Sequence, residues 1–77
     1  MEIRLRLFSI LREILPPGAK GRAVLNLEEG TTLVDLLDEL GIERKVVISV
    51  NDAHESDKLR QLHDGDEVKI FTAVSGG

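Results

Sequence analysis

The sequence predicts a small α+β domain in which two helices cover one face of a mixed β-sheet. Three observations indicate this class: aliphatic residues alternate along four segments, they recur at helical spacing along two others, and 77 residues provide only one domain. The composition agrees, since 42% of the residues are hydrophobic and 31% are charged, which is typical of a folded globular chain.

The first third of the chain predicts a strand, a helix and a second strand. Aliphatic residues alternate with arginines over residues 2–8, which predicts a strand with the aliphatic side chains on one face and the arginines on the other. We expect Ser9 to cap a short helix over residues 10–15, which the following Pro-Pro-Gly run ends. Alternation then predicts a strand over residues 22–28, paired with the first through a long hairpin loop.

The strongest local signal in the sequence predicts a helix over residues 33–40. Thr32 and Asp35 have the spacing of a capping box at its start, and Gly41 marks its end. Its leucines have the i, i+3, i+4, i+7 spacing of a single helix face: Leu33, Leu36, Leu37 and Leu40. This stripe could line a groove for a partner, but packing against the core is the commoner use of such a face, and we interpret it so.

The remaining residues predict the strands that complete the sheet. Alternation indicates strands over residues 46–50 and around Val68 and Ile70, and the polar residues 53–63 are expected to be irregular with one short edge strand. A last strand that returns to the middle of the sheet beside the first gives the β-grasp arrangement of ubiquitin. We therefore expect residues 1–72 to form a β-grasp domain and residues 73–77 to form a flexible tail.

Charge and composition exclude several classes of function. Asp and Glu outnumber Lys and Arg 14 to 10, for a net charge of −4, which argues against nucleic-acid binding. Residues 26–67 carry twelve of the acidic side chains. They could form a surface for a basic partner, or they could be an ordinary solvated surface. The absence of cysteine excludes thiolate metal sites and cysteine nucleophiles, and no apolar run suits a membrane span or a signal peptide. We expect a cytoplasmic protein.

No set of residues resembles a complete active site, a metal site or a cofactor site. His54 and His63 are the only histidines and have no cysteine or third ligand nearby, so a surface role is the better interpretation. The acidic residues between Asp52 and Glu67 lack the ligand spacing of a calcium loop, and no glycine-rich phosphate loop is present. We expect a protein that binds no cofactor and is not itself an enzyme.

The last two residues, Gly76 and Gly77, are the first candidate functional group. A terminal carboxylate becomes an electrophile once it is activated, for instance as an acyl-adenylate. Glycines next to it would pass through a narrow catalytic channel because they carry no side chain. A terminal Gly-Gly pair also arises by chance in roughly one chain in 200, so the pair alone is weak evidence.

The only two aromatic residues, Phe8 and Phe71, form the second candidate site. Both are out of phase with the inward-facing aliphatic residues of their strands. If the first and last strands are parallel neighbours, both rings lie on the open face of the sheet near the start of the tail, as a docking surface for partners. The alternative is that a loop or the Pro16-Pro17 segment covers them.

Several segments, taken in order, resemble the MoaD/ThiS family of ubiquitin-like sulfur carriers, which includes the small subunit of molybdopterin synthase. The similar segments are Leu7-Phe8-Ser9-Ile10-Leu11-Arg12-Glu13, Glu29-Gly30-Thr31-Thr32-Leu33-Val34-Asp35-Leu36-Leu37, Val50-Asn51, Leu62-His63-Asp64-Gly65-Asp66-Glu67-Val68 and the ending Val74-Ser75-Gly76-Gly77. Each segment is weak evidence separately, and their combination in this order is specific.

The resemblance implies a function for the C-terminus. An E1-like activating enzyme of the MoeB/ThiF type would adenylate the Gly77 carboxylate, consuming ATP, and a sulfur donor would convert it to a thiocarboxylate. The tail would then enter the large subunit of molybdopterin synthase, of the MoaE type, and give its sulfur to cyclic pyranopterin monophosphate. Gly76 would give access to the active sites, and Phe8, Phe71, Val74 and Ser75 would contact the partners.

The pathway that the carrier serves has alternatives. The helix expected after the first strand resembles the molybdopterin type, since the thiazole carriers often lack it. The short connection over residues 41–45 and Thr72-Ala73, where the family often has a proline pair, depart from that type. A carrier for thiamine thiazole synthesis and a ubiquitin-like protein modifier therefore remain as alternatives.

Overall fold

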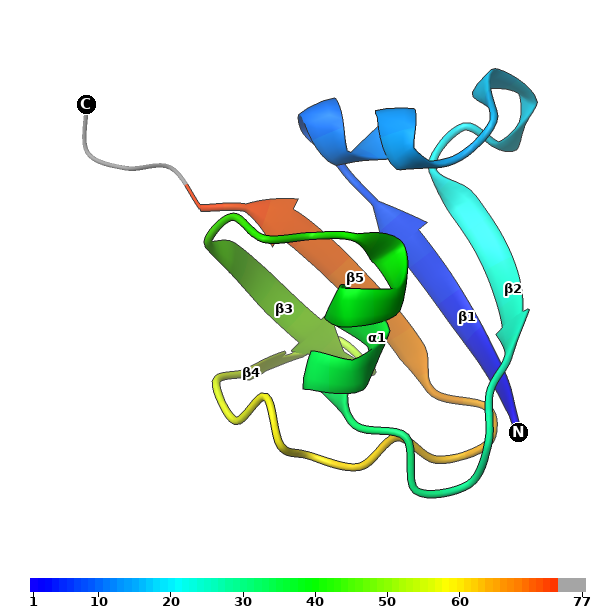
Figure 1. Ribbon diagram of the computed structural model, residues 1–77, viewed down its shortest axis with the longest axis vertical. Helices are drawn as coiled ribbons and strands as arrows, with labels where there is room; N and C mark the ends of the chain where they lie inside the picture. The colour runs from blue at the N-terminus through cyan, green and yellow to red at the C-terminus, as the bar shows by residue number, and fades with distance from the viewer. Residues whose placement is uncertain (74–77) are drawn as a thin grey trace.

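The computed structural model describes residues 1–73, and Figure 1 shows their arrangement: one sheet with helical segments on one of its faces. The elements follow in the order β1 (Glu2–Leu7), η1 (Ser9–Ile14), η2 (Pro17–Ala19), β2 (Arg22–Asn26), α1 (Leu33–Leu40), β3 (Val46–Val50), β4 (Ala53–Glu55) and β5 (Glu67–Thr72), where η denotes a 3-10 helix. None of the helices in this part of the chain is long and apolar enough to cross a membrane.

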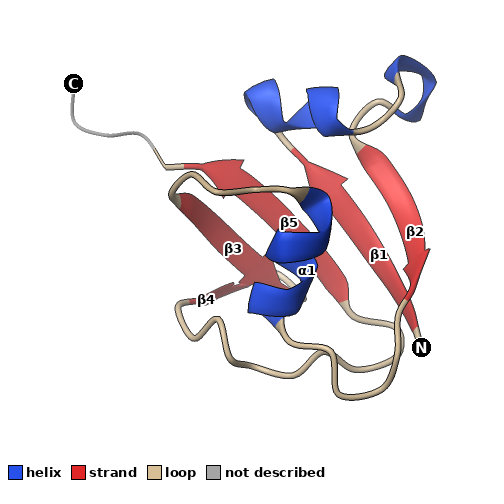
Figure 2. Cartoon of the chain, viewed as in Figure 1, coloured by secondary structure: helices blue, strands red, loops and turns tan. Residues whose placement is uncertain are grey.

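The sheet has the strand order β2-β1-β5-β3-β4, with the first and last strands side by side at its centre (Figure 2). β1 and β5 are parallel, with Leu5 beside Val68, and the other neighbouring strands are antiparallel. The short strand β4 lies at the edge, as expected within residues 53–63. With α1 across one face of this mixed sheet, the chain has the predicted β-grasp fold.

Helix α1 forms where the sequence predicts it, and both of its predicted ends are confirmed. The Asp35 amide donates to the Thr32 hydroxyl over 3.3 Å, and the Thr32 amide donates to the Asp35 carboxylate over 3.1 Å, which completes a capping box. Gly41 ends the helix in the left-handed conformation with φ at 74°. The leucine stripe faces the sheet, with Leu33, Leu36 and Leu37 buried. Its interpretation as a core face is therefore confirmed.

The predicted first helix is present, but its type and its cap differ from the prediction. It is the 3-10 helix η1, and Ser9 is its first residue rather than its cap. Phe8 occupies the capping position and makes no side-chain cap, while Ser9 has a φ of 55°. The chain turns sharply out of β1 at this point, and the left-handed backbone of Ser9 makes that turn. Only Leu11 of η1 is buried, so one side chain anchors this helix to the core.

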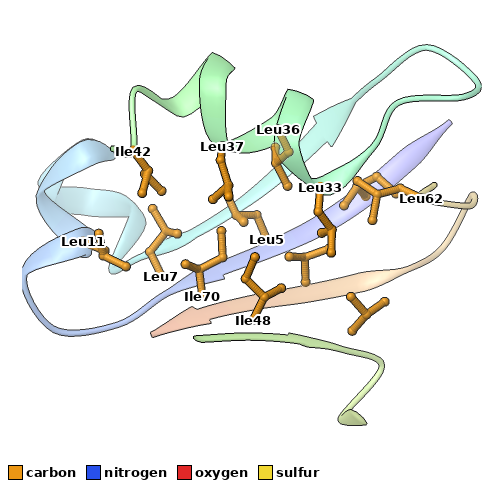
Figure 3. Close-up of a cluster of buried hydrophobic side chains, with 13 residues drawn as sticks. Leu5, Leu7, Leu11, Leu33, Leu36, Leu37, Ile42, Ile48, Leu62 and Ile70 are labelled. Atoms are coloured by element: carbon orange, nitrogen blue, oxygen red, sulfur yellow. The ribbon is translucent and has the colours of Figure 1, made fainter. Parts of the chain in front are cut away.

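The hydrophobic core lies between α1 and the face of the sheet that α1 covers (Figure 3). Alternate residues of β1, β3 and β5 point into it, as the period of two predicts. Leu11 and Ile42 extend the core beneath η1, and Leu62 extends it beneath the loop before β5. Every residue of this cluster lies between Ile3 and Ile70.

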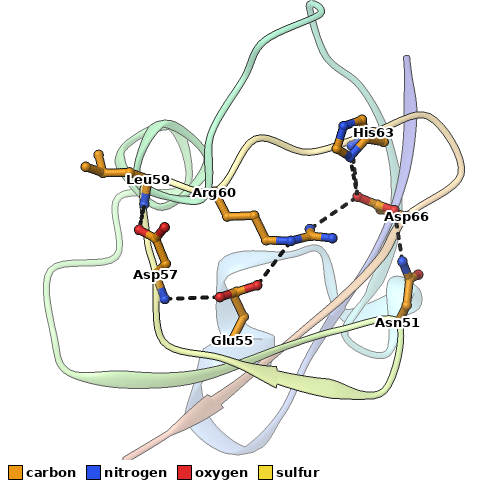
Figure 4. A network of polar contacts seen from close by, with 7 residues as sticks. All are labelled: Asn51, Glu55, Asp57, Leu59, Arg60, His63 and Asp66. Carbon is orange, nitrogen blue, oxygen red and sulfur yellow. Dashed lines mark hydrogen bonds and ion pairs between the residues drawn. The ribbon is translucent and has the colours of Figure 1, made fainter.

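A polar network lies at the end of the sheet where β5 begins. It joins the β3–β4 turn to the loop before β5 (Figure 4). The buried Asp66 carboxylate accepts hydrogen bonds from the Asn51 side chain at 2.9 Å and from the His63 backbone amide at 2.8 Å. A guanidinium nitrogen of Arg60 lies 3.5 Å from the same carboxylate. Burial by itself would raise the pKa of Asp66, but these hydrogen bonds and the Arg60 charge outweigh it and hold the pKa below its usual value. The network therefore stabilises the folded state while Asp66 is ionised.

We expect Asp66→Asn to lower the free energy of unfolding at pH 7 by about 1–3 kcal/mol, because the backbone and side-chain donors around it lose an anionic acceptor. The native pKa of Asp66 lies below its unfolded value. Its contribution is therefore full above the unfolded pKa and disappears as the pH falls through the folded pKa. Urea unfolding between pH 7 and pH 2 should show less loss of stability with acid for the variant than for the parent. The exposed Asp38→Asn on α1 is the control, and equal acid dependence of Asp66→Asn and the parent would contradict the assignment.

Candidate functional site

The two aromatic residues meet on the face of the sheet that α1 leaves open. The parallel pairing of β1 and β5 places Leu7 beside Ile70, so that Phe8 and Phe71, one residue further along each strand, both point away from the core. Their rings stack with centroids 4.4 Å apart and an interplanar angle of 12°. The Phe8 amide donates to the Ile70 carbonyl over 3.2 Å, which holds the two residues together. The prediction that the rings share the open face is confirmed.

Two further side chains, which the sequence alone did not single out, extend this surface. Val47 of β3 pairs with Phe71 in the antiparallel register and is 41% exposed. The Arg6 guanidinium lies 5.1 Å from the centre of the Phe8 ring, in the range of a cation–π interaction. We call Phe8, Phe71 and Val47 the aromatic patch. Both rings keep part of their surface exposed, so no loop encloses them.

The aromatic patch lies at the end of the sheet where the described chain stops. β5 ends at Thr72, which pairs with Val46, and the Ala73 amide donates to the Lys45 carbonyl over 3.3 Å. The candidate residues Val74, Ser75, Gly76 and Gly77 lie outside the described residues. Four extended residues span at most about 14 Å. A partner that covers the aromatic patch can therefore also enclose residue 77.

Residues 1–73 contain other features that could serve a function, and none of them forms a metal site. No group of three or more His, Asp or Glu residues within residues 1–73 is placed to hold a metal ion. His54 and His63 are exposed, as expected of surface histidines, and Asp66 is held within the polar network. A hollow of about 680 Å³ between η1 and η2 is open and is lined partly by the exposed Ile10 and Pro17. An open, partly apolar surface of this kind can bind a partner.

A protein-family model for the ThiS family matches residues 5–77. No curated protein is significantly similar to the sequence. The match to the family model includes the second half of β1, α1, the polar network and the last residue of the chain.

Solved structures with low sequence identity share the fold. A Pyrococcus furiosus protein described as a candidate molybdopterin converting factor, subunit 1, has a TM-score of 0.77 and 22% identity over 96% of this chain and 99% of its own. A chain of the complex of subunits 1 and 2 of the molybdopterin-converting factor from Helicobacter pylori has a TM-score of 0.66 and 20% identity, with both chains fully covered. Small archaeal modifier protein 1 from Haloferax volcanii has a TM-score of 0.73 and 18% identity over 95% of this chain and 98% of its own.

Proposed function

The chain belongs to the ThiS family, and from this premise we propose that it carries sulfur as a thiocarboxylate on Gly77. The observation that carries the proposal is the position of the aromatic patch, at the end of β5 from which the last residues continue. The family match reaches residue 77, so the Gly-Gly ending belongs to the matched pattern. The function then requires a surface that docks on an enzyme and a carboxylate that reaches its active site.

The proposed chemistry needs no catalytic group on this chain. In an E1-like activating enzyme, a carboxylate oxygen of Gly77 attacks the α-phosphorus of ATP, and pyrophosphate leaves. A donor then delivers sulfur at the oxidation level of sulfide, which attacks the carbonyl carbon as AMP leaves. The acyl carbon keeps its oxidation state, and one oxygen atom has been exchanged for sulfur. The contribution of this chain is to place the carboxylate, with Gly76 beside it adding no side chain that could obstruct the approach.

We propose the molybdopterin pathway as the destination of the sulfur. The acceptor would be cyclic pyranopterin monophosphate, bound in a large synthase subunit that docks on the aromatic patch and the Val74-Ser75 segment. Two observations support this choice over thiazole synthesis. The chain has a helix, η1, between β1 and β2, which thiazole carriers often lack. The similar chains from P. furiosus and H. pylori are described as molybdopterin converting factor components.

The second candidate is a ubiquitin-like modifier that forms isopeptide bonds with protein lysines. The likeness to small archaeal modifier protein 1 favours it. Thr72-Ala73, in place of a proline pair, favours it too, because the chain before the last four residues then has fewer conformational restraints. Both candidates begin with adenylation of Gly77, and they differ in the nucleophile that takes the acyl group.

The absence of cysteine makes the proposal directly testable, because a thiocarboxylate would be the only strong sulfur nucleophile on the chain. We expect incubation with the host's activating enzyme, ATP and sulfide, followed by a thiol-alkylating reagent, to give one adduct. Fragment mass spectrometry should place it at Gly77, and omission of ATP should abolish it. An unmodified Gly77, with the enzyme active on a known carrier, would contradict the proposal.

Two further reactions separate the destinations of the sulfur. Addition of the large synthase subunit and cyclic pyranopterin monophosphate should consume the thiocarboxylate and form the dithiolene product. A ladder of conjugates in the host extract, lost when Gly77 is removed, would instead support the modifier. Consumption only by a thiazole synthase would place the chain in the thiamine pathway.

A further inference from the structure

Three arginines share the open face of the sheet beside the aromatic patch. Arg4 and Arg6 alternate with the buried residues of β1, and Arg22 of β2 lies directly opposite Arg6 in the antiparallel register. Within residues 1–73, no carboxylate forms an ion pair with any of the three. Like charges directly opposite on neighbouring strands destabilise a sheet. The fold therefore keeps Arg6 and Arg22 side by side, and within residues 1–73 no carboxylate is paired with either of them.

These arginines line a shallow hollow of about 310 Å³ over β1 and β2. Val24, 61% exposed, is the apolar side chain at its edge, and Glu67 is the single carboxylate in its lining. Glu67 pairs with Arg4 in the β1–β5 register and lies 3.8 Å from the Lys69 ammonium, which contacts Asp52 more closely, at 2.6 Å. Arg6, in contrast, lies between two cations in the strand pairing, Arg22 and Lys69. The hollow thus combines three guanidinium groups with one carboxylate and an apolar edge.

The rest of the molecule has the opposite charge. The net charge is −4, and α1, on the other side of the sheet, exposes Asp35, Asp38 and Glu39. The open face is therefore a local basic region on an acidic protein. A charge separation of this kind orients a molecule as it approaches a charged partner and raises the association rate.

We propose that Arg4, Arg6 and Arg22 form a docking site for an acidic surface segment of the activating enzyme. This inference rests on the proposed function and adds the chemistry of the partner. Guanidinium groups bind carboxylates in a bidentate geometry, and Val24 gives such a segment an apolar contact between its acidic side chains. The partner on this face is a protein because an open hollow with an exposed valine suits a mixed apolar and acidic surface.

Arg6 makes this docking site continuous with the aromatic patch, because its guanidinium also lies over the Phe8 ring. An enzyme that covers Phe71 in order to hold the end of the chain would extend across Phe8 to β1 and β2. Its acidic segment would then contact the arginines of β1 and β2, which lie on the other side of the aromatic patch from β3. The docking site thus sets the orientation in which Gly77 is presented.

The test compares association rates with the host's activating enzyme at low and high salt. Arg22→Gln should slow association about threefold at low ionic strength, and Arg4→Gln/Arg6→Gln/Arg22→Gln should slow it by at least tenfold. Both differences should shrink at high salt, because screening removes the electrostatic steering.

Lys58→Gln removes one positive charge outside this face and is the matched control. Arg22→Gln should not lower the melting temperature, because it relieves the repulsion between Arg22 and Arg6.

The outcomes separate this inference from the proposed function. If the parent chain is adenylated and the arginine variants associate as fast as Lys58→Gln at low salt, the docking site is wrong and the sulfur carrier stands. If the enzyme neither binds nor adenylates the parent chain, both the docking site and the proposed sulfur-carrier function are wrong. If sedimentation of the parent chain alone shows a dimer that the arginine variants lose, the occupant of the face is a second copy, and the proposal of an acidic enzyme segment is overturned.

Discussion

Removal of Gly77 is expected to abolish sulfur transfer while the free energy of unfolding stays unchanged. The reason for the loss is chemical, because the shortened chain ends on Gly76, and its carboxylate lies one residue short of the phosphorus that it must attack. Near-attack geometry requires reacting atoms about 3–3.5 Å apart, and one extended residue spans about 3.3–3.6 Å. The thiocarboxylate yield should fall below detection in the alkylation assay. An extra alanine after Gly77 should have the same effect, because it moves the reactive group and adds a side chain.

The reason for the unchanged stability is structural. Within residues 1–73, the thirteen residues of the hydrophobic core lie between Ile3 and Ile70, and the register of β5 with β3 extends to Thr72, with one further backbone hydrogen bond from Ala73. Urea unfolding of the shortened chain should therefore match that of the parent. A melting temperature lower by several degrees would show that residue 77 contributes to the fold. Transfer by the shortened chain at the parent's rate would remove Gly77 from the mechanism.

The parts of the fold that the sequence predicts well are those whose signals are local. The limits of α1 could be predicted because Thr32, Asp35 and Gly41 are adjacent to it in sequence and act on its ends directly. The strands could be predicted because burial on one face leaves a period of two. Helix η1 could be predicted only in position. Its aliphatic residues have helical spacing, but Ile10 is 52% exposed, and the turn at Ser9 has no sequence signal.

Contacts between distant segments explain what the sequence could not provide. Asn51 and Asp66 each look like turn residues, and their hydrogen bond depends on the register of β3 with β5. The position of Phe8 and Phe71 on one face was predictable because parallel neighbouring strands place both rings there, but the stacking of the rings was not predicted. The addition of Val47 to that face depends on a strand pairing that one sequence does not reveal. The same is true of Arg22, which lies opposite Arg6 and has no acidic partner among residues 1–73.

The second large effect is expected in the core, where Leu36→Ala should lower the free energy of unfolding by about 2–5 kcal/mol. Leu36 is 1% exposed and lies on the face of α1 that packs on the sheet. The substitution removes buried methyl groups and leaves a cavity that the backbone of an eight-residue helix between fixed ends can fill only in part. A domain of this size has a stability of about 4–12 kcal/mol, so the loss is a large share of the total. Thermal unfolding should shift down by at least 8 °C, at about 4–8 °C per kcal/mol.

The matched control is Leu59→Ala, which makes the same chemical change at a side chain that is 73% exposed. It should alter stability by less than about 0.5 kcal/mol. At a temperature where Leu36→Ala remains folded, its Gly77 should still form the thiocarboxylate, because the substituted side chain faces the core and not the open face of the sheet. Removal of Gly77 and Leu36→Ala thus have opposite effects. The chain without Gly77 is stable and inactive, and the Leu36→Ala chain is destabilised and active. Equal stability of the Leu36 and Leu59 variants would mean that the leucine stripe of α1 does not form the core.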